Sequence, residues 1–250
     1  MQSGAPVPRM NQDAPSLLLI THIGSKGIPA MSEASASASA RLVTFPATGG
    51  RGGNQVRILG IGGTTSAKSW SLVPLREALQ RADSLGCETT LATVYDLNLP
   101  LLHTEWRLED YPPTLSWLLD EVRRADGIII CSPTYHGTIS GAIKNVLDLL
   151  IFLGRDNPPY LGGKPVGLMA YGGMTAMGVL HTLTNCVRGL KGISIPTHVA
   201  VPENCINRDE VRIDNPRIET RIDLMVEELV SYADHLRGRT VTRLHLASEG

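Results

Sequence analysis

The chain has 250 residues with 23 basic and 24 acidic side chains, so its formal net charge is only -1. Hydrophobic residues make up 42% and charged residues 19% of the sequence, which provides enough apolar material for a core and excludes a wholly disordered chain. The near-neutral balance gives no basic surface for nucleic acid or for anionic lipid. The apolar runs 17–20 and 147–153 are far shorter than the roughly 20 residues of a spanning helix. We therefore expect no nucleic-acid partner and no membrane partner.

The cysteine pattern indicates a reducing compartment. Cys87, Cys131, Cys186 and Cys205 lie far apart, with no C-x-x-C pair and no histidine at the spacing of a zinc ligand. Disulfides are conceivable for an even number of cysteines in a secreted protein. At this chain length and spacing, small buried hydrophobic side chains are the better interpretation. The sequence thus predicts reduced thiols, no metal site and a cytoplasmic location.

The first 55 residues differ in composition from the rest. They contain the run MSEASASASA and the glycine-rich GGRGGNQ, and such segments bury too little apolar surface to offset chain entropy. We expect 1–55 to be a disordered leader, 56–238 a folded domain and 239–250 a tail. A transit peptide and a later start at Met10 or Met31 both remain open for the leader.

From residue 56 onward, short β-branched runs alternate with amphipathic stretches of helical length. The pattern predicts five strands, at 56–61, 89–96, 127–133, 165–171 and 195–201. It predicts five helices, from Leu72 to a stop at Gly86, from Pro112 to Ala125, over 140–152, over 176–191, and from Ile218 to Ala233. This alternation is typical of an α/β fold, a parallel sheet with helices on both faces. Ligands of such sheets bind beyond the carboxyl ends of the strands, so the loops after the first, third and fourth strands are the candidate site.

The loop after the first strand, 62–71, reads GGTTSAKSWS and indicates an anion cradle. Five hydroxyl groups and one lysine stand at a strand-to-helix turn, where the first helical amides are unpaired. The candidate phosphate-binding residues are Thr64, Ser66, Lys68, Ser69 and Ser71. Ordinary helix capping by Ser69 or Ser71 is the alternative interpretation.

Three other phosphate motifs are missing at their diagnostic positions. A dinucleotide-binding fingerprint requires glycine where Thr65 stands. A Walker loop requires glycine before the lysine, and Ala67 precedes Lys68. A cysteine phosphatase would need an arginine six residues after Cys131, where Gly137 stands. These classes of enzyme are not supported.

The loop after the third strand reads CSPTYHGTISGAIKNVLDLL and is the most informative stretch. Its aromatic rings and glycines would allow the chain to lie against a planar ligand. It resembles the loop of the NADPH-dependent FMN reductase family, which commonly reads S-P-x-Y-x-G-S-x-x-G-x-L-K-N followed by A-L-D. The matching residues are Ser132, Pro133, Tyr135, Gly137, Gly141, Lys144, Asn145 and Asp148. Thr138 is a conservative variant, and Thr134 and His136 replace the frequent Glu and Asn.

The resemblance covers most of 56–205 and implies a flavodoxin-like, doubly wound sheet of five parallel strands in the order 2-1-3-4-5. It implies that FMN is bound, with the isoalloxazine ring against Pro133, Thr134, Tyr135, His136 and Gly137 and its polar edge near Gly172, Gly173 and Met174. In the first loop the family usually reads G-S-x-R-x-x-S-x-N. Here Ser66 replaces the arginine and Ser71 the asparagine, which leaves Lys68 as the cation that can replace the arginine.

The function implied is an NAD(P)H-dependent flavin oxidoreductase. Hydride would pass from NADPH or NADH to FMN, and onward to a flavin, a quinone or another small-molecule acceptor. The chemistry is carried by the flavin, so no catalytic acid, base or nucleophile is predicted. Two alternatives remain: a flavodoxin-type FMN electron carrier without a nicotinamide site, and a binding module that has lost the cofactor.

Some residues of the third loop and its helix have structural interpretations. Lys144, Asn145 and Asp148 are expected to lie on the helix surface and to orient this loop by hydrogen bonds, and Cys131 is expected to pack in the core. An apolar set on the helix exceeds what one sheet face needs, namely Ile143, Val146, Leu147, Leu150 and Ile151. With the family resemblance, this surplus predicts a homodimer or homotetramer, and packing within one chain is the alternative.

Overall fold

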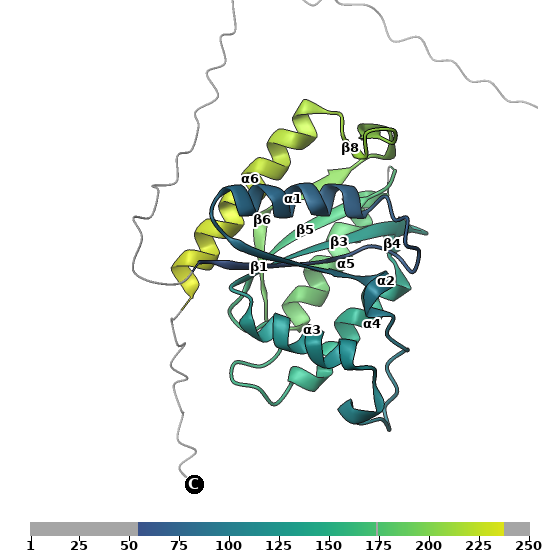
Figure 1. Ribbon diagram of the computed structural model, residues 1–250, viewed down its shortest axis with the longest axis vertical. Coiled ribbons are helices and arrows are strands. Elements are labelled where there is room, and N and C mark those ends of the chain that lie inside the picture. Colours follow the sequence, from purple (N-terminus) through teal and green to yellow (C-terminus); the bar gives the residue numbers. More distant parts are fainter. Residues whose placement is uncertain (1–54, 174, 238–250) are drawn as a thin grey trace, which may run out of the picture. The chain divides into compact units, whose positions relative to one another are not determined.

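The computed structural model describes residues 55–173 and 175–237, so the predicted tail and nearly all of the predicted leader lie outside the described residues. The main sheet contains five long parallel strands in the order β2-β1-β3-β5-β6 (Figure 1). They are β1 (Arg57–Gly62), β2 (Glu88–Thr93), β3 (Gly127–Tyr135), β5 (Pro165–Tyr171) and β6 (Ile193–Val201). Counted along the chain, this is the predicted order 2-1-3-4-5 of a flavodoxin-like fold.

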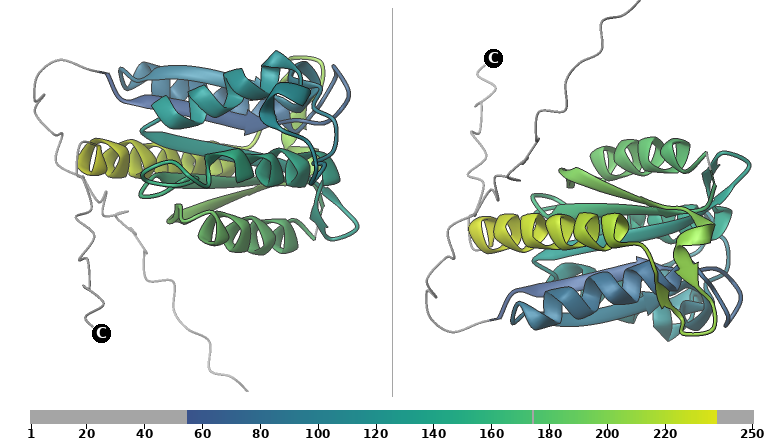
Figure 2. Two further views of the ribbon diagram at one scale, coloured as in Figure 1. Left: turned by 90° about the horizontal axis from the view of Figure 1, so that it is seen from below. Right: turned by 90° about the horizontal axis from the view of Figure 1, so that it is seen from above.

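Helices cover both faces of the sheet, as predicted. In Figure 1, α1 and α6 lie above the sheet and α3, α4 and α5 below it, and Figure 2 shows the same layers from two further directions. The bounds are α1 (Leu72–Ser84), α3 (Pro113–Arg124), α4 (Gly141–Leu149), α5 (Ala176–Gly189) and α6 (Pro216–Leu236). The β1–β2 connection through α1 thus runs over one face, and the three later connections through α3, α4 and α5 run over the other, so the direction of winding reverses at β1, as in a doubly wound sheet.

The central strand β3 shows how the sequence builds two cores. Because side chains alternate along a strand, Ile128 and Ile130 join the apolar cluster under α3, α4 and α5, whereas Ile129 and Cys131 join the cluster under α1 and α6. All four side chains are fully buried. Burial of each isoleucine contributes roughly 1.5–3 kcal/mol to folding. The carboxyl end of β3 is thereby held firmly between its neighbours.

The second predicted strand is too long at its end. β2 stops at Thr93, and Val94–Leu97 forms the short helix α2. Thr93 Oγ1 accepts a hydrogen bond from the Asp96 amide at 3.0 Å, which caps the helix, and the αL conformation of Asn98 (φ 42°) ends it. The β-branched and aromatic residues of this stretch favoured a strand, but the cap decides the local structure.

Pro133 does not end the third strand, contrary to the prediction. β3 continues to Tyr135 and pairs with the short antiparallel strand β4 (Thr138–Ile139). His136 and Gly137 form the turn with φ values of 50° and 81°. Two successive residues with positive φ match the type I′ turn that favours tight hairpins. The predicted ring-binding loop is therefore a hairpin.

Smaller differences concern helix ends and elements with few residues. The predicted helix over 140–152 is α4 followed by the 3-10 helix η2 (Leu150–Leu153), and α5 ends at Gly189. The unpredicted elements are η1 (Leu108–Asp110), η3 (Glu203–Cys205), β7 (Ile206–Asn207) and β8 (Arg212–Ile213). These elements are too short to show a hydrophobic period in the sequence.

The apolar surplus of the fourth helix is mostly used within the chain. Ile143, Val146, Leu147 and Leu150 are buried in the core, and only Ile151 of the predicted set is exposed, at 54%. Packing within one chain, the alternative interpretation, thus explains four of these five residues. None of the helices in the described ranges combines the length and apolarity that crossing a membrane requires.

Candidate functional site

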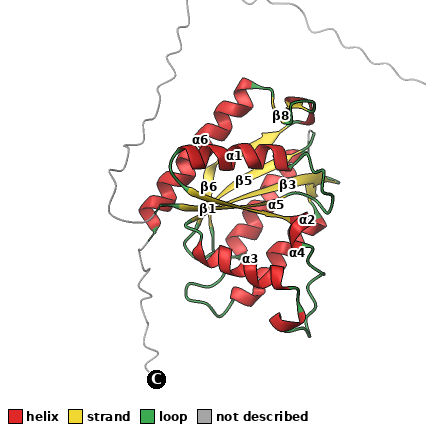
Figure 3. Cartoon of the chain, in the orientation of Figure 1, coloured by secondary structure: helices red, strands yellow, loops and turns green. Residues whose placement is uncertain are grey.

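Three loops meet at the carboxyl edge of the sheet. They follow β1, β3 and β5, which are adjacent and parallel strands. The loop 63–71, the β3–β4 hairpin and residues 172 and 173 therefore emerge at the same end of the sheet (Figure 3). The predicted site residues lie on these loops, except Met174, which lies outside the described residues. This edge includes the switch point between β1 and β3, where open α/β sheets bind ligands.

The first loop presents donors rather than acceptors. Thr64 Oγ1 accepts a hydrogen bond from the Ser66 amide at 3.1 Å, and Ser66 Oγ accepts one from the Lys68 amide at 3.3 Å. Each hydroxyl shapes the loop and keeps its own proton to donate. Within the described part of the chain, the amides of Ala67 and Ser69 have no hydrogen-bond acceptor. A loop with such donors is suited to an anion.

Helix capping does not account for the serines of this loop. Ser71 occupies the N-cap position of α1 but its side chain makes no capping hydrogen bond. Its hydroxyl instead lies 2.9 Å from that of Ser69. The first turn of α1 contains no acidic residue, so the partial positive charge of the helix terminus is not neutralised there. Lys68 is exposed and adds a full positive charge to the loop.

The β3–β4 hairpin presents an aromatic ring beside this loop. Tyr135 is 50% exposed, His136 is exposed at the turn, and Pro133 is buried below them. The base of the hairpin is fixed by Ser132 Oγ, which accepts the Ser140 amide at 3.1 Å. Ser140 Oγ in turn accepts the Ile143 amide at 3.2 Å and caps α4.

Thr134 and Gly172 join the second loop to the third. A β carbon at position 172 would lie 2.6 Å from Thr134 Oγ1, and the φ of 149° at this position also favours glycine. Thr134 Oγ1 is buried and has no hydrogen-bond partner within the described residues. A buried hydroxyl without a partner is costly, and it is common where a ligand supplies the missing bond. Gly173 is exposed next to this junction.

Asn145 was predicted to orient the ring-binding loop, but its hydrogen bonds go to a different segment. Asn145 Oδ1 accepts the Leu102 amide, and its Nδ2 donates to the Pro100 carbonyl, both at 2.9 Å. The side chain thus fixes the segment that follows α2. Lys144 and Asp148 instead form an exposed ion pair with each other at 2.6 Å on the same helix, and neither side chain bonds to the ring-binding loop within the described residues.

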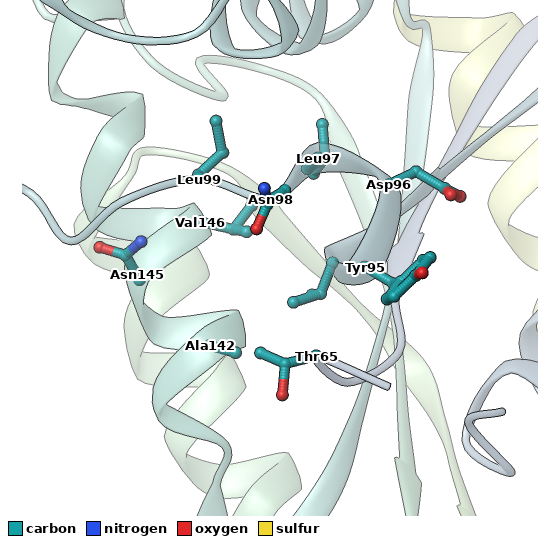
Figure 4. Close-up of a pocket in the computed structure, with 10 residues that line it drawn as sticks. Thr65, Tyr95, Asp96, Leu97, Asn98, Leu99, Ala142, Asn145 and Val146 are labelled. Atoms are coloured by element: carbon teal, nitrogen blue, oxygen red, sulfur yellow. The ribbon is translucent and has the colours of Figure 1, made fainter. Parts of the chain in front are cut away.

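A cleft of about 440 Å³ beside the first loop was not predicted. It lies between the α2 segment and α4, and Figure 4 shows Thr65 and Ala142 at one end with the Asp96 carboxylate pointing away from α4. The lining residues are Thr65, Val94, Tyr95, Asp96, Leu97, Asn98, Leu99, Ala142, Asn145 and Val146. The sequence pattern predicted a strand over the whole of 89–96, so the wall of the cleft that α2 forms was not predicted. The Thr93-x-x-Asp96 spacing was the signal for a helix start.

The buried thiol at this edge is structural, as predicted. Burial raises the pKa of Cys131 to about 12, and its Sγ donates to the Ser71 carbonyl at 3.2 Å. A protonated, fully buried thiol is neither a nucleophile nor a metal ligand. All four cysteines are free of disulfides. Among the described residues, no group of three or more His, Cys, Asp and Glu side chains is arranged to hold a metal ion.

Comparison with known families identifies the chain. The profile of the family described as NADPH-dependent FMN reductase matches residues 56–204, which include the first, second and third loops. The chain belongs to this family. The resemblance found in the second loop is thus confirmed across most of the described domain.

Two curated relatives agree with this assignment, and one solved structure shares the fold. An FMN-dependent NADPH-azoreductase of Staphylococcus haemolyticus is 32% identical over 120 residues, 46% of this chain and 61% of that protein. The Staphylococcus aureus protein of the same name is 30% identical over 132 residues, 51% of this chain and 67% of its own. The chain thus spans about two thirds or less of these relatives. FerB, an NAD(P)H:acceptor oxidoreductase from Paracoccus denitrificans, superposes with a TM-score of 0.58 at 16% identity, covering 72% of this chain and 98% of FerB. At that identity the superposition shows the flavodoxin-like fold alone.

Proposed function

We propose that this family member is an NAD(P)H-dependent flavin oxidoreductase that binds FMN and passes electrons to a small-molecule acceptor. The observation that carries the proposal is the junction of Thr134 and Gly172, where a buried hydroxyl without a partner lies at the meeting point of two predicted flavin loops. Family membership and the printed names of the relatives support the same activity. Those names make azo compounds the first acceptors to test.

The residues at this edge fit the two ends of FMN. The amides of Ala67 and Ser69 and the hydroxyl protons of Thr64 and Ser66 would hold the phosphate, with Lys68 nearby in the same loop. A second set would hold the ring system, namely Pro133, Thr134, Tyr135, His136, Gly137, Gly172, Gly173 and Met174. When bound, FMN supplies the redox chemistry. The chain's own part is to bind, to orient and to exclude water, so proximity and orientation carry the rate.

A flavodoxin-type electron carrier is the alternative function. Such a carrier would bind FMN on the same fold without a site for a nicotinamide nucleotide. The net charge of -1 lacks the strong acidity usual for carriers, and Ala67 stands where their loop has glycine. The cleft beside Thr65 favours the enzyme, because its volume of about 440 Å³ suits a small molecule.

A flavin and nicotinamide assay separates the possibilities. Purified protein is mixed with excess FMN, freed of unbound flavin, and examined for a flavin absorbance band and for NADPH and NADH oxidation with an azo dye or a quinone. A retained flavin with sustained oxidation supports the oxidoreductase. Retained flavin without turnover supports the carrier, and absence of flavin retention contradicts both.

The phosphate loop has its own test in Lys68→Ala. Because Lys68 is the one full positive charge of the loop 62–71, its loss should weaken FMN binding by about tenfold, a typical effect for a charge-assisted hydrogen bond. Riboflavin, which lacks the phosphate, is the control ligand and its affinity should not change. Equal FMN affinity of both proteins would mean that amides and hydroxyls hold the phosphate without the lysine.

We also propose a homodimer or homotetramer located in the cytoplasm. The exposed Ile151 at the end of the α4 segment supports an assembly, and the wide spacing of the four cysteines, three of them buried, supports a reducing compartment. Light scattering coupled to gel filtration tests the assembly. A monomeric mass at micromolar concentration would contradict it.

A further inference from the structure

The β7–β8 hairpin stands outside the part of the chain that the family profile matches, which ends at residue 204. It is nevertheless firmly attached to the domain. Ile206 and Ile213 are buried in the core, the Ile213 amide donates to Glu77 Oε1 of α1 at 2.5 Å, and the Asp214 amide donates to the Cys205 carbonyl at 2.8 Å. In Figure 1 the hairpin lies beside α1 at the end of the sheet that carries the three loops. Its turn is therefore presented from a rigid base.

Arg208 in this hairpin reaches the phosphate loop. Its guanidinium carbon lies 5.3 Å from the centre of the Trp70 ring, and Trp70 stands between Ser69 and Ser71. This distance is within the range of a cation–π interaction. The stacking holds the planar guanidinium beside the first loop and leaves its edge free for hydrogen bonds.

The charge of Arg208 is not neutralised by a carboxylate. In the described ranges, no ion pair involves Arg208, whose side chain is exposed. The neighbouring Arg212, by contrast, pairs with both Glu210 and Asp214. Within one small hairpin, one arginine is therefore engaged with acidic partners and the other is held over an aromatic ring with its charge available.

The charge of Arg208 also acts on the end of β5, from which the third loop starts. Burial raises the pKa of the Tyr171 phenol, and the Arg208 side chain opposes that rise. Tyr171 is the last residue of β5 and directly precedes Gly172. Arg208 thus lies over Trp70 of the first loop, and its charge is felt at the end of β5, along one border of the candidate site.

We propose that Arg208 binds a phosphate group of a nucleotide cofactor at this border. The inference rests on the proposed function and adds a residue that lies beyond the family-matched segment. A guanidinium presents a planar fork that suits phosphate, and stacking on Trp70 reduces the entropy lost on binding. The first loop has Ser66 in place of the family's arginine, so Arg208 supplies from another element the guanidinium that this loop lacks. The phosphate is either that of FMN or one of the nicotinamide dinucleotide.

Direct binding of flavins tests whether Arg208 binds the phosphate of FMN. Apoprotein carrying Arg208→Gln is titrated with FMN and with riboflavin, followed by quenching of flavin fluorescence. If Arg208 binds the FMN phosphate, FMN affinity falls about tenfold and riboflavin affinity stays the same. Arg155→Gln is the matched control, because it removes the same charge from an exposed residue in the loop before β5, at the opposite end of the sheet.

A second experiment tests whether the phosphate belongs to the nicotinamide dinucleotide. It measures the binding of 2′,5′-ADP and 5′-AMP to the FMN-loaded protein and the KM values for NADPH and NADH. Loss of affinity for 2′,5′-ADP alone, with a raised KM for NADPH only, assigns Arg208 to the 2′-phosphate. An equal rise of both KM values, with both nucleotides weakened, assigns it to the phosphate groups that NADPH and NADH share. Trp70→Leu should reproduce part of the loss, because it removes the ring on which the guanidinium rests.

The inference fails if Arg208→Gln binds FMN and both adenine nucleotides like the control and keeps both KM values. That result would leave the proposed function intact, since wild-type protein would still bind FMN and oxidise NADPH. Failure of the wild-type protein to bind any flavin would overturn the proposed function instead. The melting temperature of each variant, which should match that of the wild type for an exposed arginine, checks that folding is unchanged.

Discussion

Gly178 of α5 lies so close to the Gly137 carbonyl that a β carbon at position 178 would be 2.2 Å from that oxygen. The hydroxyls of Thr138 and Thr182 lie 3.1 Å apart beside this contact, and Thr182 Oγ1 donates to the Gly178 carbonyl at 2.9 Å. The turn of the β3–β4 hairpin therefore rests on the first half of α5. The position of the predicted ring-binding residues therefore depends on α5, the helix that connects β5 to β6.

Gly178→Ala should displace this hairpin. The methyl group would overlap a backbone oxygen, so we expect a loss of stability of about 1–3 kcal/mol and weaker FMN binding. Gly189→Ala is the matched control, because that glycine ends the same helix and a β carbon there would have nothing within 4 Å. Urea unfolding and flavin titration measure the two effects. Equal behaviour of both variants would show that the hairpin can shift without consequence.

Thr134→Val should have opposite effects on the free and the FMN-bound protein. Valine keeps the shape but removes the buried hydroxyl without a partner, so the flavin-free protein should become more stable by about 1 kcal/mol. If the hydroxyl bonds to FMN, affinity should fall about two- to tenfold. Thr134→Ser keeps the hydroxyl and serves as the control. A variant that leaves both the free energy of unfolding and the FMN affinity unchanged would remove Thr134 from the site.

Asn145→Ala should loosen the segment after α2 that borders the cleft. It removes two hydrogen bonds from a buried side chain and leaves the Leu102 amide and the Pro100 carbonyl without partners. We expect a loss of about 1–3 kcal/mol. Lys144→Gln is the control on the same helix, because breaking an exposed ion pair should change stability by less than about 1 kcal/mol. If Asn145→Ala is as stable as the control, water replaces the lost bonds.

The parallel sheet could be predicted because long apolar runs fix their own structure, whereas the order of its strands was implied by the family resemblance. Residues such as Ile128 to Ile130 are buried on both faces, and few alternatives to a central parallel strand satisfy that pattern. The long helices were found for the same reason. The position of the first loop between a strand and a helix was also predicted, because the apolar run of β1 and the helical spacing of α1 bound it on both sides.

The features that were missed depend on local hydrogen bonds or on contacts distant in sequence. The helix α2 follows from one capping hydrogen bond, from the Asp96 amide to Thr93 Oγ1, and this bond outweighs residue types that favour a strand. The β3–β4 hairpin follows from two positive φ values at His136 and Gly137. Arg208 reaches Trp70 only because the chain folds back over α1, and no pattern in the sequence links residues so far apart.

The fully buried thiol of Cys131 predicts that the protein loses stability in alkaline solution. Burial raises its pKa from 9.0 to about 12, so the unfolded chain releases this proton at a lower pH than the folded protein does. The contribution of the protonated Cys131 thiol to the free energy of unfolding is therefore fully present below pH 9, and it is lost as the pH rises from about 9 towards 12. Between pH 8 and pH 10 we expect the free energy of unfolding to fall by about 1 kcal/mol more in the wild type than in Cys131→Ala. Urea titrations at both pH values measure this difference. Because each protein is compared with itself at the two pH values, the cost of the small cavity that Cys131→Ala creates cancels. The same fall in both proteins would mean that other groups, such as Cys87 with its pKa raised to about 11 chiefly by burial, account for the alkaline loss.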